Sequence, residues 1–164
     1  MTKRSPVPLA VRIGNWFVTP LVRLGVNIGL IHLLTVRGRK TGQLRTTPVA
    51  VVEQQGQRYL VAAFGLVGWV YNLRAAGEAT LTRGRRSERI KAIELSPEEA
   101  APVLKACLAS TESFQDYFTA TAQSPLEEFE QEARHHPVFL VQHIAERVSQ
   151  RSRGQALHPP EEEK

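Results

Sequence analysis

The chain has 164 residues, 42% of them hydrophobic and 7% aromatic, which is enough for one globular domain with a core and unlike a disordered chain. Its 21 Lys and Arg outnumber its 16 Asp and Glu, and the net charge of +5 favours acidic partners such as nucleic acid, anionic lipid or a phosphorylated ligand. The single cysteine, Cys107, excludes an internal disulfide framework and fits a reducing compartment. The single aspartate, Asp116, argues against hydrolytic metal chemistry.

The two ends of the chain differ in composition from its middle. Residues 1–8 are polar and contain proline, and residues 149–164 are rich in Ser, Arg, Gly, Pro and Glu, so we expect both to be disordered. A single domain is therefore predicted over residues 9–148.

The N-terminal part of this domain has helical periodicity. Apolar residues recur at three- and four-residue steps from Leu9 to about Ile28, which predicts one or two amphipathic helices broken at Pro20. Packing on the core is the simplest interpretation, and contact with a membrane surface is the alternative because arginines flank Trp16 and Phe17. No signal peptide is evident, so we expect a cytoplasmic protein, with membrane association as the alternative.

Six segments have the composition of β-strands. Short connections join the first three segments, which predicts an antiparallel meander, and Gly84-Arg85-Arg86 marks a second hairpin between the next two. The six segments are His32–Gly38, Leu44–Glu53, Gln57–Phe64, Glu78–Arg83, Ser87–Leu95 and His136–His143. Such connections exclude a doubly wound α/β sheet and favour a small β-barrel with covering helices.

Three further segments are predicted to be helical. Trp69–Ala76 has the pattern of a short helix ended by Gly77, with Trp69, Leu73 and Ala76 on one helical face. Ser96-Pro97-Glu98-Glu99 is a capping box that opens a helix over Ala100–Ser110, with the aromatic residues that follow continuing at helical spacing, and a last helix starts near Ser124 and runs to about His135.

The strongest local signal is the segment Thr35–Thr47, T-V-R-G-R-K-T-G-Q-L-R-T-T. Four cations (Arg37, Arg39, Lys40 and Arg45) lie within nine residues around two glycines, between two predicted strands. A tight turn at Lys40–Gln43 would expose backbone N–H groups beside these charges, as a phosphate site requires. A solvated basic turn explains the same residues, and local chemistry leaves both interpretations open.

A second candidate lies at the end of the third strand. The small residues Ala62, Ala63, Gly65 and Gly68 would let a flat ring approach the backbone, with Phe64 and Trp69 as apolar walls. A phosphate and a flat ring together suggest a flavin-like ligand, although a simply packed helix also accounts for W-V-Y-N-L-R.

Other chemistries find little support in the sequence. There is no Gly-x-Ser-x-Gly elbow, and Cys107 lies within a predicted helix. His135, His136 and His143 lack the carboxylate or Cys pattern of a metal site, so we interpret them as strand-end or surface polar groups and predict no metal.

Taken together, G-R-K-T-G-Q-L-R-T-T-P-V and the later A-A-F-G-x-x-G-W-V-Y-N-L-R-A-A-G resemble the deazaflavin (F420)-dependent nitroreductase family of split β-barrel oxidoreductases. The resemblance implies a split β-barrel like that of pyridoxamine phosphate oxidase, and reduced coenzyme F420 as hydride donor to a quinone, enone or nitro compound, with FMN as the alternative cofactor. It also implies a homodimer, since such barrels are often dimers.

The resemblance further implies which residues bind the cofactor. Arg39, Lys40 and Arg45 would meet its phosphate and acidic tail, its ring would lie against Thr47, Pro48 and the Ala62–Leu66 backbone, and Tyr71 is the candidate proton donor. The full set of expected cofactor-binding residues is Arg39, Lys40, Thr41, Gly42, Arg45, Thr46, Thr47, Pro48, Ala62, Ala63, Phe64, Gly65, Leu66, Trp69 and Asn72.

The chain departs from this family pattern at Phe64, Leu66, Gly68 and Tyr71, where the related loop has Tyr, Glu, Asn and Arg. The pocket is thus more apolar, which favours a hydrophobic acceptor such as a quinone or a different way of holding the cofactor.

Two other functions compete with this assignment. A non-catalytic F420 or flavin carrier would share the same site. An anionic-surface or nucleic-acid binder would use the cations of the second hairpin, but no aromatic residues are interleaved there for base stacking, so we expect no nucleic acid. Those cations are Arg83, Arg85, Arg86, Arg89 and Lys91.

Overall fold

The computed structural model describes residues 31–145. Its elements are β1 (Ile31–Arg37), β2 (Leu44–Gln54), β3 (Gln57–Val61), α2 (Gly68–Ala76), β4 (Glu78–Arg83), β5 (Arg86–Glu94), α3 (Pro97–Ser110), the 3-10 helix η1 (Glu112–Tyr117), α4 (Leu126–Ala133) and β6 (Val138–His143). The helices expected over Leu9–Ile28, the two disordered ends and the domain limits near residues 8 and 148 lie outside the described residues.

The six strands close into an antiparallel barrel in the order β1-β2-β3-β6-β5-β4. Leu33 of β1 pairs with Pro48 of β2 on one side and with Thr82 of β4 on the other, which closes the ring. In the same way Leu140 of β6 pairs with Tyr59 of β3 and with Ile93 of β5. The expected split β-barrel of six antiparallel strands with covering helices is confirmed.

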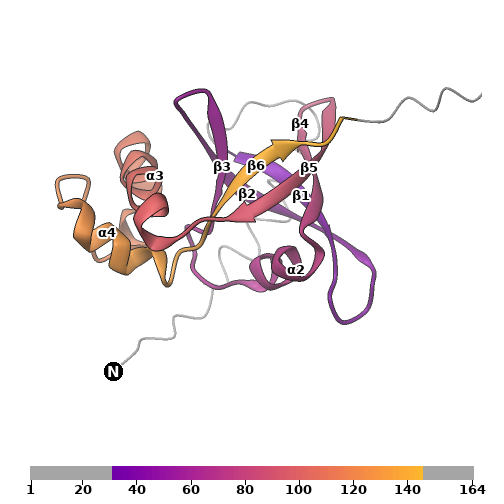
Figure 1. Cartoon of the computed structure of the whole chain (residues 1–164), viewed down its shortest axis with the longest axis horizontal. Helices are drawn as coiled ribbons and strands as arrows, with labels where there is room; N and C mark the ends of the chain where they lie inside the picture. The colour runs from indigo at the N-terminus through magenta and orange to yellow at the C-terminus, as the bar shows by residue number, and fades with distance from the viewer. Residues whose placement is uncertain (1–30, 146–164) are drawn as a thin grey trace, which may run out of the picture.

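Two apolar clusters stabilise this arrangement. One combines residues of all six strands with α2, including Leu34, Leu60 and Phe139, and forms the barrel interior. The other joins β2 and β3 to α3 and α4, with Leu104 and Phe129 fully buried. Figure 1 shows α3 and α4 together on one flank of the barrel, whereas α2 lies apart from them beside β1.

The helices follow local sequence signals closely. The Ser96 hydroxyl accepts from the Glu99 N–H and the Glu99 carboxylate accepts from the Ser96 N–H, which confirms the capping box at α3. In α2 the buried residues are Val70 and Leu73, whereas Ala76 is exposed. Val70 and Leu73 also lie three residues apart, and this spacing places them on one face.

The structure differs from the predicted elements at the end of the third strand and after α3. The third strand ends at Val61 instead of Phe64, because the Ala62 carbonyl accepts from the Gly65 N–H in a turn and so leaves the ladder. The aromatic segment after α3 forms the 3-10 helix η1, started by the Thr111 hydroxyl, which accepts from the Ser113 N–H.

Candidate functional site

The basic turn between β1 and β2 spans Gly38–Gln43, wider than the predicted Lys40–Gln43. The Gly38 N–H donates to the Gln43 carbonyl at 2.8 Å, and the Gly42 N–H donates to the Gly38 carbonyl at 2.8 Å. Gly42 has a φ of 70°, which suits glycine, and a Cβ at Gly38 would come within 3.1 Å of the Gln43 oxygen. Arg37 Nη1 donates to the Gly42 carbonyl at 2.9 Å and so braces the turn with its own side chain.

Arg39 ties this turn to helix α2. Its backbone N–H and its Nη1 both donate to Asn72 Oδ1, each at 3.2 Å, across 33 residues of sequence. Its guanidinium carbon also lies 5.0 Å from the centre of the Tyr71 ring. The turn and α2 therefore form one polar surface, and the Asn72 amide oxygen is already engaged in holding Arg39.

Like Arg39, Lys40 and Arg45 have no ion-pair partner among residues 31–145, but their side chains also lack the hydrogen bonds that hold Arg39. Both side chains are exposed, as are Thr41 and Gly42 between them. Exposed cations without a carboxylate nearby can receive an anion without first breaking an internal pair. The two therefore provide free positive charge beside the backbone of the turn.

Two arginines lie near the ring of Tyr71. Besides Arg39, the Arg74 guanidinium carbon lies 5.9 Å from its ring centre, and Arg74 forms a two-pronged pair with Glu94 at 2.8 and 2.7 Å. The hydrogen bond to Glu94 raises the pKa of Arg74, so the guanidinium stays charged. No motif in the sequence indicated the Arg74–Glu94 pair, which joins residues on α2 and β5.

The predicted residues of β2 lie next to the turn. The Thr46 hydroxyl shares a hydrogen bond of 2.8 Å with that of Thr35, whereas Thr47 and Pro48 are half-buried opposite Leu34 and Leu33. Thr47 and Pro48 thus offer a partly covered surface rather than a row of free polar groups.

The loop after β3 is more rigid than its small residues suggest. Ala62 and Ala63 are buried in the core, and the Ala62 carbonyl accepts from the Gly65 N–H at 2.9 Å and lies 3.0 Å from His136 Nδ1. The Ala62 N–H donates to the Pro137 carbonyl at 3.0 Å. Because the backbone groups of Ala62 already have partners, a ligand ring can pack against this loop but gains no hydrogen bond from that residue.

Sequence reasoning missed the group that fixes this loop. His136 is only 6% exposed and stacks on Phe118 at 4.0 Å between ring centres. Burial lowers its pKa, so the ring is neutral near pH 7 and donates through Nδ1–H to the Ala62 carbonyl. Its Nε2 lies 3.7 Å from Oε2 of Glu132, whose other oxygen accepts from the Ala120 N–H at 2.8 Å. The prediction that His136 is a strand-end or surface group is wrong.

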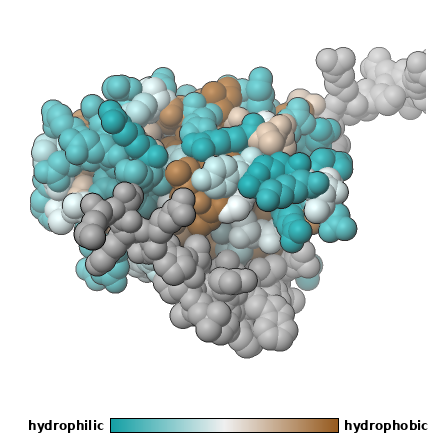
Figure 2. Space-filling model, turned by 90° about the horizontal axis from the view of Figure 1, so that it is seen from below, coloured by the Kyte–Doolittle hydropathy of each residue, from teal (hydrophilic) through white to brown (hydrophobic). Residues whose placement is uncertain are grey.

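Apolar side chains come to the surface beside this loop. Phe64 and Leu66 are 36% and 41% exposed, and the Phe64 ring meets Phe114 and Tyr117 edge to face at 5.6 and 4.7 Å. Trp69 is half-buried and packs on Phe139 at 6.0 Å. Figure 2 shows hydrophobic residues at the surface between hydrophilic areas on the side of the molecule seen from below.

The structure thus brings the basic turn into contact with α2, but it shows no direct contact between this turn and the apolar residues of the loop after β3. Arg39 and Asn72 are in contact, and Lys40, Thr41, Gly42 and Arg45 share the turn. No direct contact links the turn to Phe64 or Leu66 in the hydrogen bonds, ion pairs and ring contacts of residues 31–145. Within the same residues, no group of three or more His, Cys, Asp or Glu is arranged to hold a metal ion.

Helices of the described region are too short or too polar to cross a membrane. No curated protein sequence matches the chain.

Several solved structures resemble the chain. The structure of an F420-H2 dependent reductase, FDR-A, shares 26% identity over 69% of this chain and 94% of its own, with a TM-score of 0.50. A domain-swapped dimer shares 22% identity over 77% of this chain and 95% of its own, with a TM-score of 0.52. The Agrobacterium tumefaciens protein Atu2129, of unknown function, has a TM-score of 0.52 at 15% identity, covering 87% of this chain and 57% of its own.

A protein-family model also matches the chain. The model of the F420H(2)-dependent quinone reductase family matches residues 15–126, which include the turn, the loop after β3 and helix α2. The chain therefore belongs to the F420H(2)-dependent quinone reductase family.

Proposed function

We propose that this protein is an F420H2-dependent oxidoreductase that delivers a hydride to a quinone, enone or nitro-type acceptor. The observation that carries the proposal is the double hydrogen bond from Arg39 to Asn72, which joins the cationic turn to α2. Family membership and the likeness to an F420-H2 dependent reductase support the same function.

The residues of the turn fit an acidic cofactor. Lys40 and Arg45 are exposed and unpaired within the described region, and Arg39 is held in place by Asn72 and Tyr71. Charge-assisted hydrogen bonds from such groups to phosphate or carboxylate oxygens are about twice as strong as neutral ones. We propose that these three cations, with Thr41 and Gly42, hold the phosphate and the acidic tail of F420.

The ring portion would lie against Thr46, Thr47 and Pro48 and the loop Ala62–Leu66, with Trp69 at its edge. The buried His136 contributes indirectly, because it holds the Ala62 carbonyl and thereby the start of this loop. A preformed loop orients a ligand without an ordering cost at the moment of binding.

Reduced F420, when bound, supplies a hydride from its C5 atom to the acceptor. The contribution of the chain is to bind, to orient and to exclude water. Tyr71 is the proposed proton donor through its phenol oxygen, and its ring lies close to the guanidinium groups of Arg39 and Arg74. Phe64 and Leu66 would receive a hydrophobic acceptor, since both are apolar and exposed beside the loop.

Equilibrium titration of the purified protein with F420 and with FMN tests the cofactor, and consumption of reduced F420 with menadione or a nitroarene tests turnover. Lys40→Ala and Arg45→Ala are each expected to weaken F420 binding by about 1.5–3 kcal/mol. Lys91→Ala is a matched control, because it removes one exposed cation from β5, away from the turn. Binding without turnover would identify a carrier. Wild-type affinity in both turn variants would refute the assignment of the phosphate, and failure to bind F420 or FMN in the micromolar range would refute the proposed function.

A further inference from the structure

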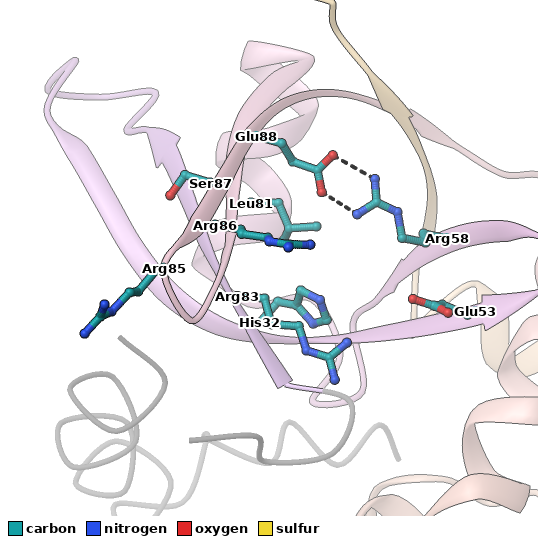
Figure 3. A pocket seen from close by; sticks show the side chains of 9 residues that line it. All are labelled: His32, Glu53, Arg58, Leu81, Arg83, Arg85, Arg86, Ser87 and Glu88. Carbon is teal, nitrogen blue, oxygen red and sulfur yellow. Dashed lines mark hydrogen bonds and ion pairs between the residues drawn. The ribbon is translucent and has the colours of Figure 1, made fainter. Parts of the chain in front are cut away.

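A second basic region lies where the β2–β3 and β4–β5 hairpins approach one another. They border a hollow of about 600 Å³, lined among others by His32, Arg58, Leu81, Arg83, Arg86 and Glu88 (Figure 3). This volume is within the range of small-molecule sites in proteins, roughly 300–1,000 Å³. The hollow is therefore large enough for a compact ligand.

This hollow lies at the opposite end of the barrel from the turn assigned to F420. His32 is near the start of β1, whereas Gly38 follows its last residue. A strand rises about 3.3 Å per residue, so the two positions are about 20 Å apart along β1. The hollow and the cationic turn are thus separate surfaces, and a ligand in one would not contact the other.

The charges around the hollow are unequal. Four arginines line it against two glutamates, Glu53 and Glu88. Arg58 takes up the charge of Glu88 through a two-pronged pair, one arm of which joins Nη2 to Oε2 at 2.9 Å. This hydrogen bonding lowers the pKa of Glu88, so the pair stays ionised and internally neutral. By formal charge, the other lining arginines, Arg83, Arg85 and Arg86, exceed Glu53 by two.

The orientation of these arginines suits an anion. In Figure 3 Arg86 reaches across the hollow near Leu81, while Arg85 points outward from the rim. Arg83 and Arg86 are paired in the register of the hairpin, so both cations start from the same point of the barrel. The hydroxyl of Ser87, also in the lining, lies 2.8 Å from that of Thr82, and the buried Leu81 adds an apolar surface.

We propose that this hollow binds the phosphate group of a phosphorylated ligand, with Arg83 and Arg86 as its principal contacts. Planar guanidinium groups match phosphate oxygens two at a time, and a phosphate dianion would balance the excess positive charge. The phosphate could be carried by a small soluble molecule or by a lipid headgroup, since both present the same chemistry.

A nucleic acid fits this surface less well. Arg89, the fourth cation of the hairpin, is already paired with Glu78 at 3.0 Å, so the cations do not form a continuous free row. None of the residues that line the hollow is Phe, Tyr or Trp, the side chains on which single-stranded bases stack.

The test is a titration of the full chain with inorganic phosphate and with glycerol 3-phosphate, followed by calorimetry and by NMR shifts of the hairpin amides. Vesicles of phosphatidylcholine with and without phosphatidic acid form the lipid arm. Arg86→Gln removes one proposed contact, and Lys91→Gln removes one charge from the outer part of the same strand. We expect Arg86→Gln to weaken binding about tenfold or more and Lys91→Gln to leave it nearly unchanged.

Each outcome bears on the proposal. Loss of soluble phosphate binding in Arg86→Gln alone supports a small phosphorylated ligand, and loss confined to the phosphatidic acid vesicles supports a headgroup. No binding in either arm, or equal loss in both variants, overturns the site. F420 affinity should stay the same in Arg86→Gln. If F420 affinity falls together with phosphate binding, the hollow is part of the cofactor site and the proposal of a separate site is refuted. If F420 does not bind to the protein at all, the proposed function fails, but the phosphate titration still tests the hollow.

Discussion

Asn72→Ala tests whether the side chain that joins the turn to α2 prepares the cofactor site. The substitution removes the one oxygen that accepts from both the backbone and the guanidinium of Arg39. Both bonds are 3.2 Å long and exposed, so each should contribute near the lower end of the usual range. Without them Arg39 would have to be ordered when F420 binds.

We estimate this loss at about 1–2 kcal/mol in total, which corresponds to roughly a 5- to 30-fold weaker affinity for F420. The free energy of unfolding should change much less, because alanine is the better helix former by up to about 0.7 kcal/mol, which partly offsets the loss of the two hydrogen bonds from Arg39 to α2. Affinity and stability should therefore separate in this variant.

Fluorescence titration with F420 and thermal unfolding measure the two quantities. The decisive control is a double-mutant cycle with Arg39→Ala. If Asn72 acts through the Arg39 side chain, then Asn72→Ala should have a smaller effect in the Arg39→Ala background, where only the hydrogen bond from the backbone N–H at position 39 remains. Additive losses of binding free energy in the double variant would show that Asn72 contacts the cofactor itself, and unchanged affinity in Asn72→Ala would refute the role altogether.

Three further predictions concern the scaffold. In the folded protein the pKa of His136 lies below its ordinary value of 6.5, so just below that pH the unfolded chain binds more protons and the free energy of unfolding should fall on acidification. The fall should be smaller in His136→Asn, and denaturant unfolding at pH 7 and pH 5.5 measures it. Ser96→Ala should cost about 1 kcal/mol in denaturant unfolding because it removes the cap of α3, and Thr119→Ala, away from this cap, is its control. Phe129→Ala should cost about 3–5 kcal/mol because its ring is fully buried, and an unchanged midpoint would contradict the packing of α4 on α3.

The parts of the fold that follow from neighbouring residues could be predicted from the sequence. Gly77 ends α2 with a φ of 69°, and Ser96 caps α3, because both effects act within four residues. The hairpins were predictable for the same reason, since Gly56 and Gly84 occupy turns with positive φ. The first three strands form the expected meander.

Contacts between distant segments could not be predicted in this way. The insertion of β6 between β3 and β5 brings His136 under the Ala62 carbonyl, and 74 residues separate the two. The same closure brings the basic β4–β5 hairpin next to Arg58 and Glu53. A sequence pattern records which side chains are available, whereas these pairings depend on the order of strands around the barrel.

In the candidate site, too, local features could be predicted and contacts between distant segments could not. The motif around Lys40 predicted a glycine turn with exposed cations, and the structure has one. The motif did not indicate that Asn72 would accept hydrogen bonds from Arg39, because these bonds depend on where α2 packs. The assignment of cofactor-binding residues stays a prediction for titration to test.

The position of β6 also has a consequence for how the chain folds. This strand is the last of the described elements and pairs on both sides, with Arg58–Val61 and with Ile90–Glu94. Until β6 is synthesised, the edges of β3 and β5 lack their partner strand, and the other five strands can form only an open sheet. Unpaired strand edges invite association between chains, so a nascent or truncated chain ending before Val138 should aggregate, and folding to a closed barrel should be a late and slow event dominated by long-range pairing.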